Sequence, residues 1–165
     1  MSKLPAELVR IARGEIGVEE IDASNCGPRV NEYKAATNLP PDEPWPWCAG
    51  FVCWTVREAA RVAGVQFTDT FRRPTTAGAW ALEAWSLAQD ASTWTKKRPG
   101  ADIKAGDIIV YSFSHCGIAA SAADSHGHFT CVEGNTDHAG SREGGSVWLK
   151  MRRTSQVRSR IRFRV

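Results

Sequence analysis

One cysteine of this chain stands where the sequence favours a nucleophile. Cys48 follows Pro46 and Trp47 and begins an apolar run that predicts a helix from Cys48 to about Ala63, closed by Gly64. Unpaired N–H groups at the start of a helix stabilise a thiolate, so they lower the pKa of a cysteine there from its free value of about 8.5. We therefore predict a nucleophilic Cys48. A buried structural cysteine is the alternative, because free cysteines are often buried.

A cysteine nucleophile needs a base, and His115 is the histidine best placed to serve. It begins a predicted strand, and the next predicted strand ends in Val132-Glu133-Gly134-Asn135. Two neighbouring strands of this length can bring Glu133 or Asn135 beside the His115 imidazole. The predicted catalytic set is Cys48 as nucleophile, His115 as general base and later general acid, Glu133 as the group that orients His115, and Asn135 as a fourth contributor.

The other potential metal ligands predict neither a metal site nor a cofactor. One group lies near a predicted hairpin, but its spacing matches no common zinc motif, and turn histidines and core cysteines are the expected reading. A second group of loop oxygens lacks the closely spaced acidic loop of a calcium site. The first group is Cys116, His126, His128 and Cys131, the second is Asp22, Asn25, Asp42 and Glu43, and His138 is a further turn histidine.

Length and composition predict one globular domain over residues 1–165. The 165 residues, 42% of them hydrophobic, suffice for one well-packed core and are too few for two comfortable ones. The N-terminus lacks the apolar core of a secretory signal, and no stretch approaches the roughly 20 apolar residues of a membrane helix. We expect a monomer made in the cytoplasm without membrane insertion. The five cysteines are an odd number, so at least one thiol is free unless chains pair.

The net charge of +3 conceals a basic C-terminal segment. Residues 150–165 hold one lysine and six arginines and no acid, so subtracting these +7 from +3 leaves −4 for the rest of the chain. From Val157 to Val165 the arginines alternate with other residues, which is the period of a strand with one solvated face. A solvated terminal strand is our interpretation. Binding of an anionic polymer such as nucleic acid is the alternative, and no nucleic-acid partner is expected.

Helical periodicity dominates the first half of the chain and strand periodicity the second. Helices are predicted from Leu4 to about Ala12, from Pro28 to about Ala36, from Cys48, and from a cap at Thr75 or Thr76 to about Ala88. Helices followed by an antiparallel sheet indicate an α+β fold of two layers. The predicted strands are 108–111, 116–120, 129–133, 147–151 and 157–165.

Taken together, these motifs resemble the CHAP family of cysteine peptidoglycan hydrolases, within the NlpC/P60 group of papain-like folds. The resemblance runs from about Glu15 to the final strand and implies N-terminal helices on an antiparallel sheet of about five to six strands. Cys116 departs from the pattern, because valine commonly follows the histidine in such proteins. The motifs are Pro46-Trp47-Cys48 with Phe51-Val52, Lys104-Ala105-Gly106-Asp107-Ile108, His115-Cys116-Gly117-Ile118 and Glu133-Gly134-Asn135-Thr136, and phage endolysin-like members also share Asn25-Cys26-Gly27-Pro28 and Gly144-Gly145-Ser146-Val147.

The resemblance implies cleavage of amide bonds in peptidoglycan stem peptides, by amidase or endopeptidase action. We expect a phage endolysin that acts on the cell wall after release, with peptidoglycan as its partner and without a separate cell-wall-binding domain. Trp45 and Trp47, beside the nucleophile, are expected to wall the substrate cleft. The alternatives are an interbacterial amidase toxin of the same fold, with an immunity protein as partner, and an inactive wall-binding module.

Overall fold

The helices come first along the chain, as periodicity predicts. In the computed structural model, which describes residues 3–165, α1 spans Leu4–Gly14, α2 Pro28–Lys34 and α3 Cys48–Ala63. Pro28 opens α2, and Gly64 closes α3 in the left-handed conformation, at φ 73°. Each of these local signals therefore places a helix end correctly.

The fourth helix is shorter than the sequence predicts. α4 covers Ala81–Leu87 and is preceded by Trp80, not capped by Thr75 or Thr76. The Thr76 hydroxyl accepts a hydrogen bond from the Gly78 N–H, at 3.2 Å, in a turn before the helix. Threonine side chains satisfy such turns as readily as helix caps, so the residue type alone does not distinguish them.

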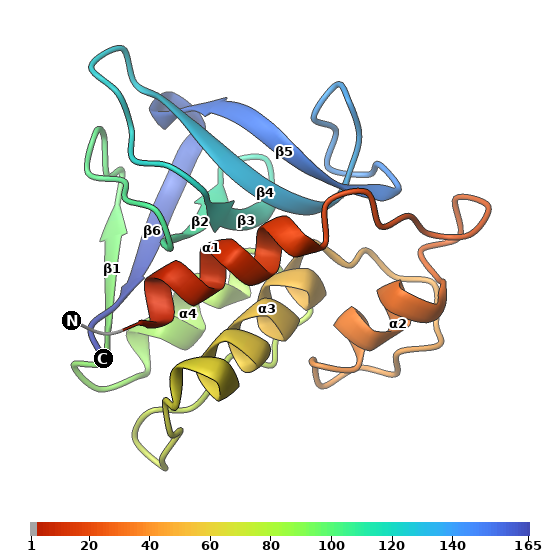
Figure 1. Ribbon diagram of the computed structural model, residues 1–165, viewed down its shortest axis with the longest axis horizontal. Helices are drawn as coiled ribbons and strands as arrows, with labels where there is room; N and C mark the ends of the chain where they lie inside the picture. Colours follow the sequence, from red (N-terminus) through yellow and green to blue (C-terminus); the bar gives the residue numbers. More distant parts are fainter. Residues whose placement is uncertain (1–2) are drawn as a thin grey trace.

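An antiparallel sheet occupies the second half of the chain (Figure 1). Its six strands lie in the order β1-β6-β2-β3-β4-β5, and a short 3-10 helix separates β5 from β6. The fold class is thus the predicted α+β arrangement. The strands are β1 (Thr93–Lys97), β2 (Ile108–Tyr111), β3 (Cys116–Ala119), β4 (His128–Thr136), β5 (Ser146–Arg153) and β6 (Val157–Phe163).

The helices pack on one face of the sheet, and the centre of the other face is also buried. α1 and α3 pack on β3 and β4, while α4 packs on β1, as Figure 1 shows. Ile108, Cys116 and Val132 point into this helical core. On the opposite face, Ile109 and Tyr111 belong to a smaller buried cluster. Because β2 is buried on both sides, its whole sequence is apolar.

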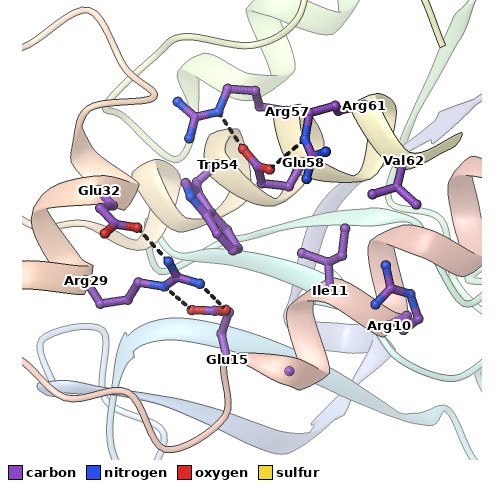
Figure 2. A pocket seen from close by; sticks show the side chains of 11 residues that line it. Arg10, Ile11, Glu15, Arg29, Glu32, Trp54, Arg57, Glu58, Arg61 and Val62 are labelled. Carbon is purple, nitrogen blue, oxygen red and sulfur yellow. Dashed lines mark hydrogen bonds and ion pairs between the residues drawn. The ribbon is translucent and has the colours of Figure 1, made fainter. Parts of the chain in front are cut away.

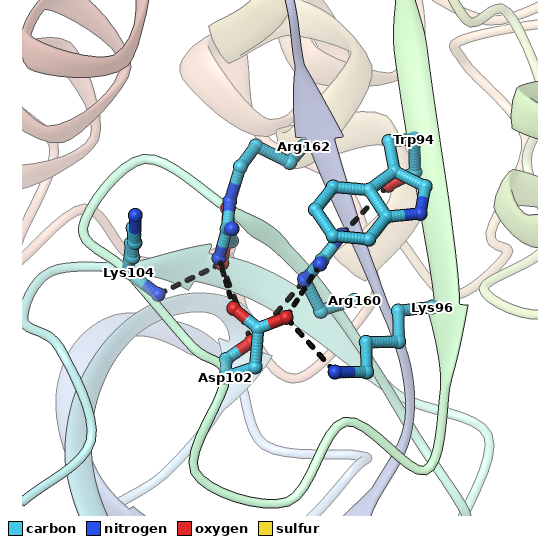
Figure 3. A network of polar contacts seen from close by, with 7 residues as sticks. Trp94, Lys96, Asp102, Lys104, Arg160 and Arg162 are labelled. Carbon is cyan, nitrogen blue, oxygen red and sulfur yellow. Dashed lines mark hydrogen bonds and ion pairs between the residues drawn. The ribbon is translucent and has the colours of Figure 1, made fainter.

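The interpretation of the C-terminal segment as a strand with one solvated face is wrong for most of its length. β6 lies inside the sheet between β2 and β1, a strand that periodicity did not reveal. Arg160 is fully buried, with its guanidinium 4.0 Å from the Trp94 ring centroid and 2.8 Å from Asp102. Asp102 lies among Lys96, Arg160 and Arg162 (Figure 3), and Arg162 also binds Asp107 through two nitrogens at 2.8 Å. These arginines neutralise buried or half-buried carboxylates, which weakens the case for an anionic polymer as partner.

Among residues 3–165, no helix is long and apolar enough to cross a membrane.

Candidate active site

Cys48 is the first residue of α3 and lies almost out of contact with solvent. Its residue surface is 6% exposed. As a first-turn residue it has no intrahelical acceptor for its own N–H, and the N–H of Ala49 stabilises its sulfur. The helix start therefore presents the thiol as the sequence predicts, next to backbone donors.

His115 lies immediately before β3 and faces Glu133 of β4. The distance from His115 Nε2 to Glu133 Oε1 is 2.9 Å, and both side chains are fully buried. The ring N–H is not aligned for a regular hydrogen bond, so we describe the contact as an ion pair. With Nε2 directed at the carboxylate, Nδ1 is the nitrogen left to serve the Cys48 thiol.

The electrostatics favour a thiolate–imidazolium pair. The neighbouring Cys116 thiol and the nearby His115 ring hold the pKa of Cys48 well below its usual range, against the opposing effect of burial. Burial alone would lower the pKa of His115, but Cys48 and Glu133 together raise it to about 9. Burial and the neighbouring Cys48 raise the pKa of Cys116, so these directions favour a thiolate at Cys48 rather than at Cys116.

Glu133 is held by partners that the sequence did not identify. Arg152 of β5 donates to Glu133 Oε2 through Nε, at 2.9 Å, and to Oε1 through Nη2, at 2.6 Å. The Tyr111 hydroxyl donates to Oε2 at 3.0 Å. Burial raises the pKa of Glu133, but Arg152 and His115 outweigh it and the pKa is lowered. The carboxylate is therefore ionised. In the sequence, Arg152 stood out only by its place in the basic segment and by the endolysin-like Gly144-Gly145-Ser146-Val147 loop that leads to Arg152-Arg153.

A glycine makes room for the Glu133 side chain. An added Cβ at Gly117 would lie 2.6 Å from Glu133 Cγ and 2.6 Å from the carbonyl oxygen of Val132. Gly134 likewise lets α3 pack close to β4, because an added Cβ there would lie 2.8 Å from Phe51 Cβ. Both glycines belong to motifs singled out in the sequence, and steric access explains their presence.

Asn135 binds the start of the helix rather than the histidine. Its Oδ1 accepts a hydrogen bond from the Trp47 N–H at 2.8 Å, and its Nδ2 donates to Gly144 O at 2.7 Å and Asn25 Oδ1 at 3.2 Å. Its φ of 57° falls in a stretch of β4 where the register with β5 shifts. Asn135 thus fixes the peptide that leads into Cys48.

The two tryptophans predicted to wall a cleft differ in position. Trp47 is fully buried, stacks on Tyr33 with ring centroids 5.6 Å apart, and donates from Nε1 to Glu20 at 2.9 Å. It offers no surface to a substrate, which corrects the expectation from sequence. Trp45 is half-buried, and its Nε1 donates to Pro40 O at 2.8 Å.

The hollow bordering the predicted site is small and acidic. It measures about 180 Å³ and is lined by Pro46 and Asn135 together with Glu20, Asn25 and Glu143. It therefore borders the segment that positions Cys48 and offers carboxylates to an approaching ligand.

A larger hollow lies elsewhere, between α1, α2 and α3 (Figure 2). It measures about 420 Å³ and holds none of the predicted catalytic residues. Arg29 binds Glu15 and Glu32 there, and Glu58 binds two further arginines. Its charges are thus largely matched within the protein.

Neither metal ligands nor disulfides are assembled in the described part of the chain. Over residues 3–165, no three His, Cys, Asp or Glu side chains are grouped so as to hold a metal ion. The cysteines within the same range are all free thiols.

Comparison with known proteins gives a structural match only. Neither a scan against protein-family models nor a search of curated proteins finds a match. Among solved structures, the chain is similar to the wild-type endolysin LysIME-EF1, with a TM-score of 0.56 and 20% sequence identity. The chain shares the fold of this endolysin. The match covers 98% of this chain and 64% of the endolysin chain, so the present chain spans less than two thirds of that length.

Proposed function

We propose that this protein is a cysteine peptidoglycan hydrolase that cleaves amide bonds of cell-wall stem peptides, as a phage endolysin does. The observation that carries the proposal is the buried arrangement of Cys48 at a helix start, His115 beside it, and Glu133 2.9 Å from His115. The endolysin-like fold supports the wall as substrate. Neither feature alone would suffice, because folds host many activities.

The proposed reaction uses the thiolate and the imidazolium in turn. The Cys48 thiolate attacks the scissile carbonyl, and backbone N–H donors including that of Cys48 stabilise the oxyanion. His115 gives its proton to the departing amine, which leaves a thioester on Cys48. Neutral His115 then takes a proton from water as the water attacks the thioester, and hydrolysis releases the acyl product and restores the Cys48 thiolate and the His115 imidazolium. Glu133 keeps the ring in place and stabilises the imidazolium through both steps.

Purified sacculi and defined muropeptides test the proposal. The protein should release new N-termini from the stem peptides, and mass spectrometry of the fragments distinguishes an amidase from an endopeptidase. Cys48→Ala and His115→Ala should each abolish the release while retaining the fold by circular dichroism. Full activity in either variant would refute the mechanism. Binding to sacculi without any release of amines would instead favour the inactive wall-binding module.

A further inference from the structure

The partner of the Glu133 carboxylate is a buried arginine with a complete set of contacts. The Arg152 residue is 6% exposed, and its guanidinium binds both oxygens of Glu133. It also donates to Gly140 O at 3.0 Å. The guanidinium lies over the Tyr111 and Phe113 rings, 5.1 Å and 5.2 Å from their centroids. Such a bidentate arginine–carboxylate contact fixes both the distance and the orientation of Glu133 relative to Arg152.

The backbone is shaped to admit this arginine. Gly140 has a φ of 81°, and a Cβ on it would lie 2.9 Å from Arg152 Nη1. The same rings that face Arg152 also face the histidine, because the Tyr111 and Phe113 centroids lie 6.0 Å and 5.9 Å from that of His115. Arg152 is therefore built into the site from several elements.

The charges in the site indicate a role for Arg152 beyond structural support. A Cys48 thiolate and a His115 imidazolium cancel, which leaves the Glu133 carboxylate as an uncompensated buried charge unless a cation accompanies it. Burying one net charge is costly, and the site would relieve that cost by binding a proton. Arg152 supplies the missing positive charge.

The remaining titratable neighbours do not supply this charge. Tyr111 and Cys131 face Glu133, and burial raises the pKa of each, so both are neutral. Cys116 and Cys53 face the nucleophile, and burial raises their pKa values too. His115 and Arg152 are thus the cations around the carboxylate.

We propose that Arg152 is a positioning residue that holds Glu133 against His115 and keeps the buried set of Cys48, His115, Glu133 and Arg152 electrically neutral. This inference rests on the proposed cysteine mechanism, because the charges it balances are those of the thiolate and the imidazolium. Without Arg152 the set carries a net negative charge and takes up a proton more readily. Formation of the Cys48 thiolate then requires a higher pH.

The test is the pH dependence of Cys48 alkylation by iodoacetamide, which needs no cell wall. Mass spectrometry of the Cys48 peptide separates its labelling from that of Cys26, which is partly exposed. In Arg152→Met the midpoint of the alkylation rate should move to higher pH by about one unit or more. Arg152→Lys retains the positive charge but not the two-nitrogen contact, and its midpoint should lie close to that of the wild type.

A second, partly buried arginine provides the matched control. Arg162 of β6 makes the same two-nitrogen contact, with Asp107. Arg162→Met should lower stability and leave the Cys48 midpoint unchanged. Should Arg152→Met not fold, Arg152→Gln carries the same test, since glutamine keeps a donor for Glu133 without the charge.

A folded Arg152→Met or Arg152→Gln protein with the wild-type midpoint would overturn the inference. The proposed function fails independently of it, because a chain that shows the shift in alkylation and still leaves peptidoglycan intact refutes the hydrolase and not the charge balance.

Discussion

The Glu133 side chain crosses β3 above Gly117, where an added Cβ would lie 2.6 Å from its Cγ. The Val132 carbonyl is equally near, and backbone does not move aside cheaply. Gly117→Ala should therefore destabilise the fold by about 1–3 kcal/mol and reduce hydrolysis further by displacing Glu133. Thermal unfolding and initial rates at equal folded protein separate the effects. Gly14→Ala, at the end of α1 with no heavy atom within 4 Å of its Cβ, is the control and should leave hydrolysis unchanged without lowering stability.

The pH profile of hydrolysis should show the raised pKa of His115. A raised pKa keeps the imidazolium protonated to higher pH, so activity should hold through neutral pH and fall as pH rises through about 9. Alkylation of Cys48 requires only the thiolate and should not fall there. An alkaline limb near pH 6.5, the value of a free histidine, would contradict the pairing.

Cys116 should help to lower the pKa of Cys48. The neighbouring Cys116 thiol is the leading cause of the lowered pKa of Cys48. Cys116→Val is similar in size and cannot donate, so the acid limb should move to higher pH by about one unit. Cys116→Ser keeps a donor and should shift the limb less. An unchanged limb in the valine variant would show that His115 and the helix start suffice.

Asn135 should act on the position of Cys48 rather than on the protonation of His115. Asn135→Gly accommodates the φ of 57° and removes the acceptor for the Trp47 N–H, at a cost of about 1–3 kcal/mol. We expect kcat to fall while the alkaline limb stays in place. Asn135→Asp retains the acceptor and should recover much of kcat. Movement of the alkaline limb would instead support the sequence-based role of Asn135 beside the imidazole.

The buried arginine of β6 should matter for stability alone. Asp102→Asn removes the charge that faces Arg160 and should cost about 1–3 kcal/mol at neutral pH, with hydrolysis per folded molecule unchanged. Hydrogen bonds from Arg160 lower the pKa of Asp102, so its contribution to stability is present above the unfolded pKa of about 3.9 and is lost as pH falls further. Urea unfolding at neutral pH and near pH 3 should therefore show the difference between wild type and variant shrinking on the acid side.

Local signals predicted the elements that carry the candidate nucleophile and base. Gly64 ends α3 through its own backbone preference, and the apolar strand before His115 is legible as a sequence pattern. By contrast, β1 is a polar run whose strand conformation comes from pairing with β6, distant in sequence. Burial of Arg160 likewise depends on Asp102 and Trp94, which no periodicity within β6 can report.

The residues of the candidate site were easier to predict from sequence than the contacts that hold them in place. Glu133 beside His115 follows from adjacent strands, as expected. The bidentate contact of Arg152 with Glu133 depends on a loop that comes close to Arg152 at Gly140. The contacts of Asn135 depend on a register shift between β4 and β5. Such features arise from backbone geometry at loops, where residue type constrains structure weakly.

The end of β4 carries both Glu133 and Asn135, one bound to the base and the other to the peptide before the nucleophile. The same short stretch of β4 therefore positions both the His115 imidazole and the Cys48 sulfur. Because only Gly134 separates Glu133 from Asn135, a change that distorts this stretch of β4 should displace the base and the nucleophile together.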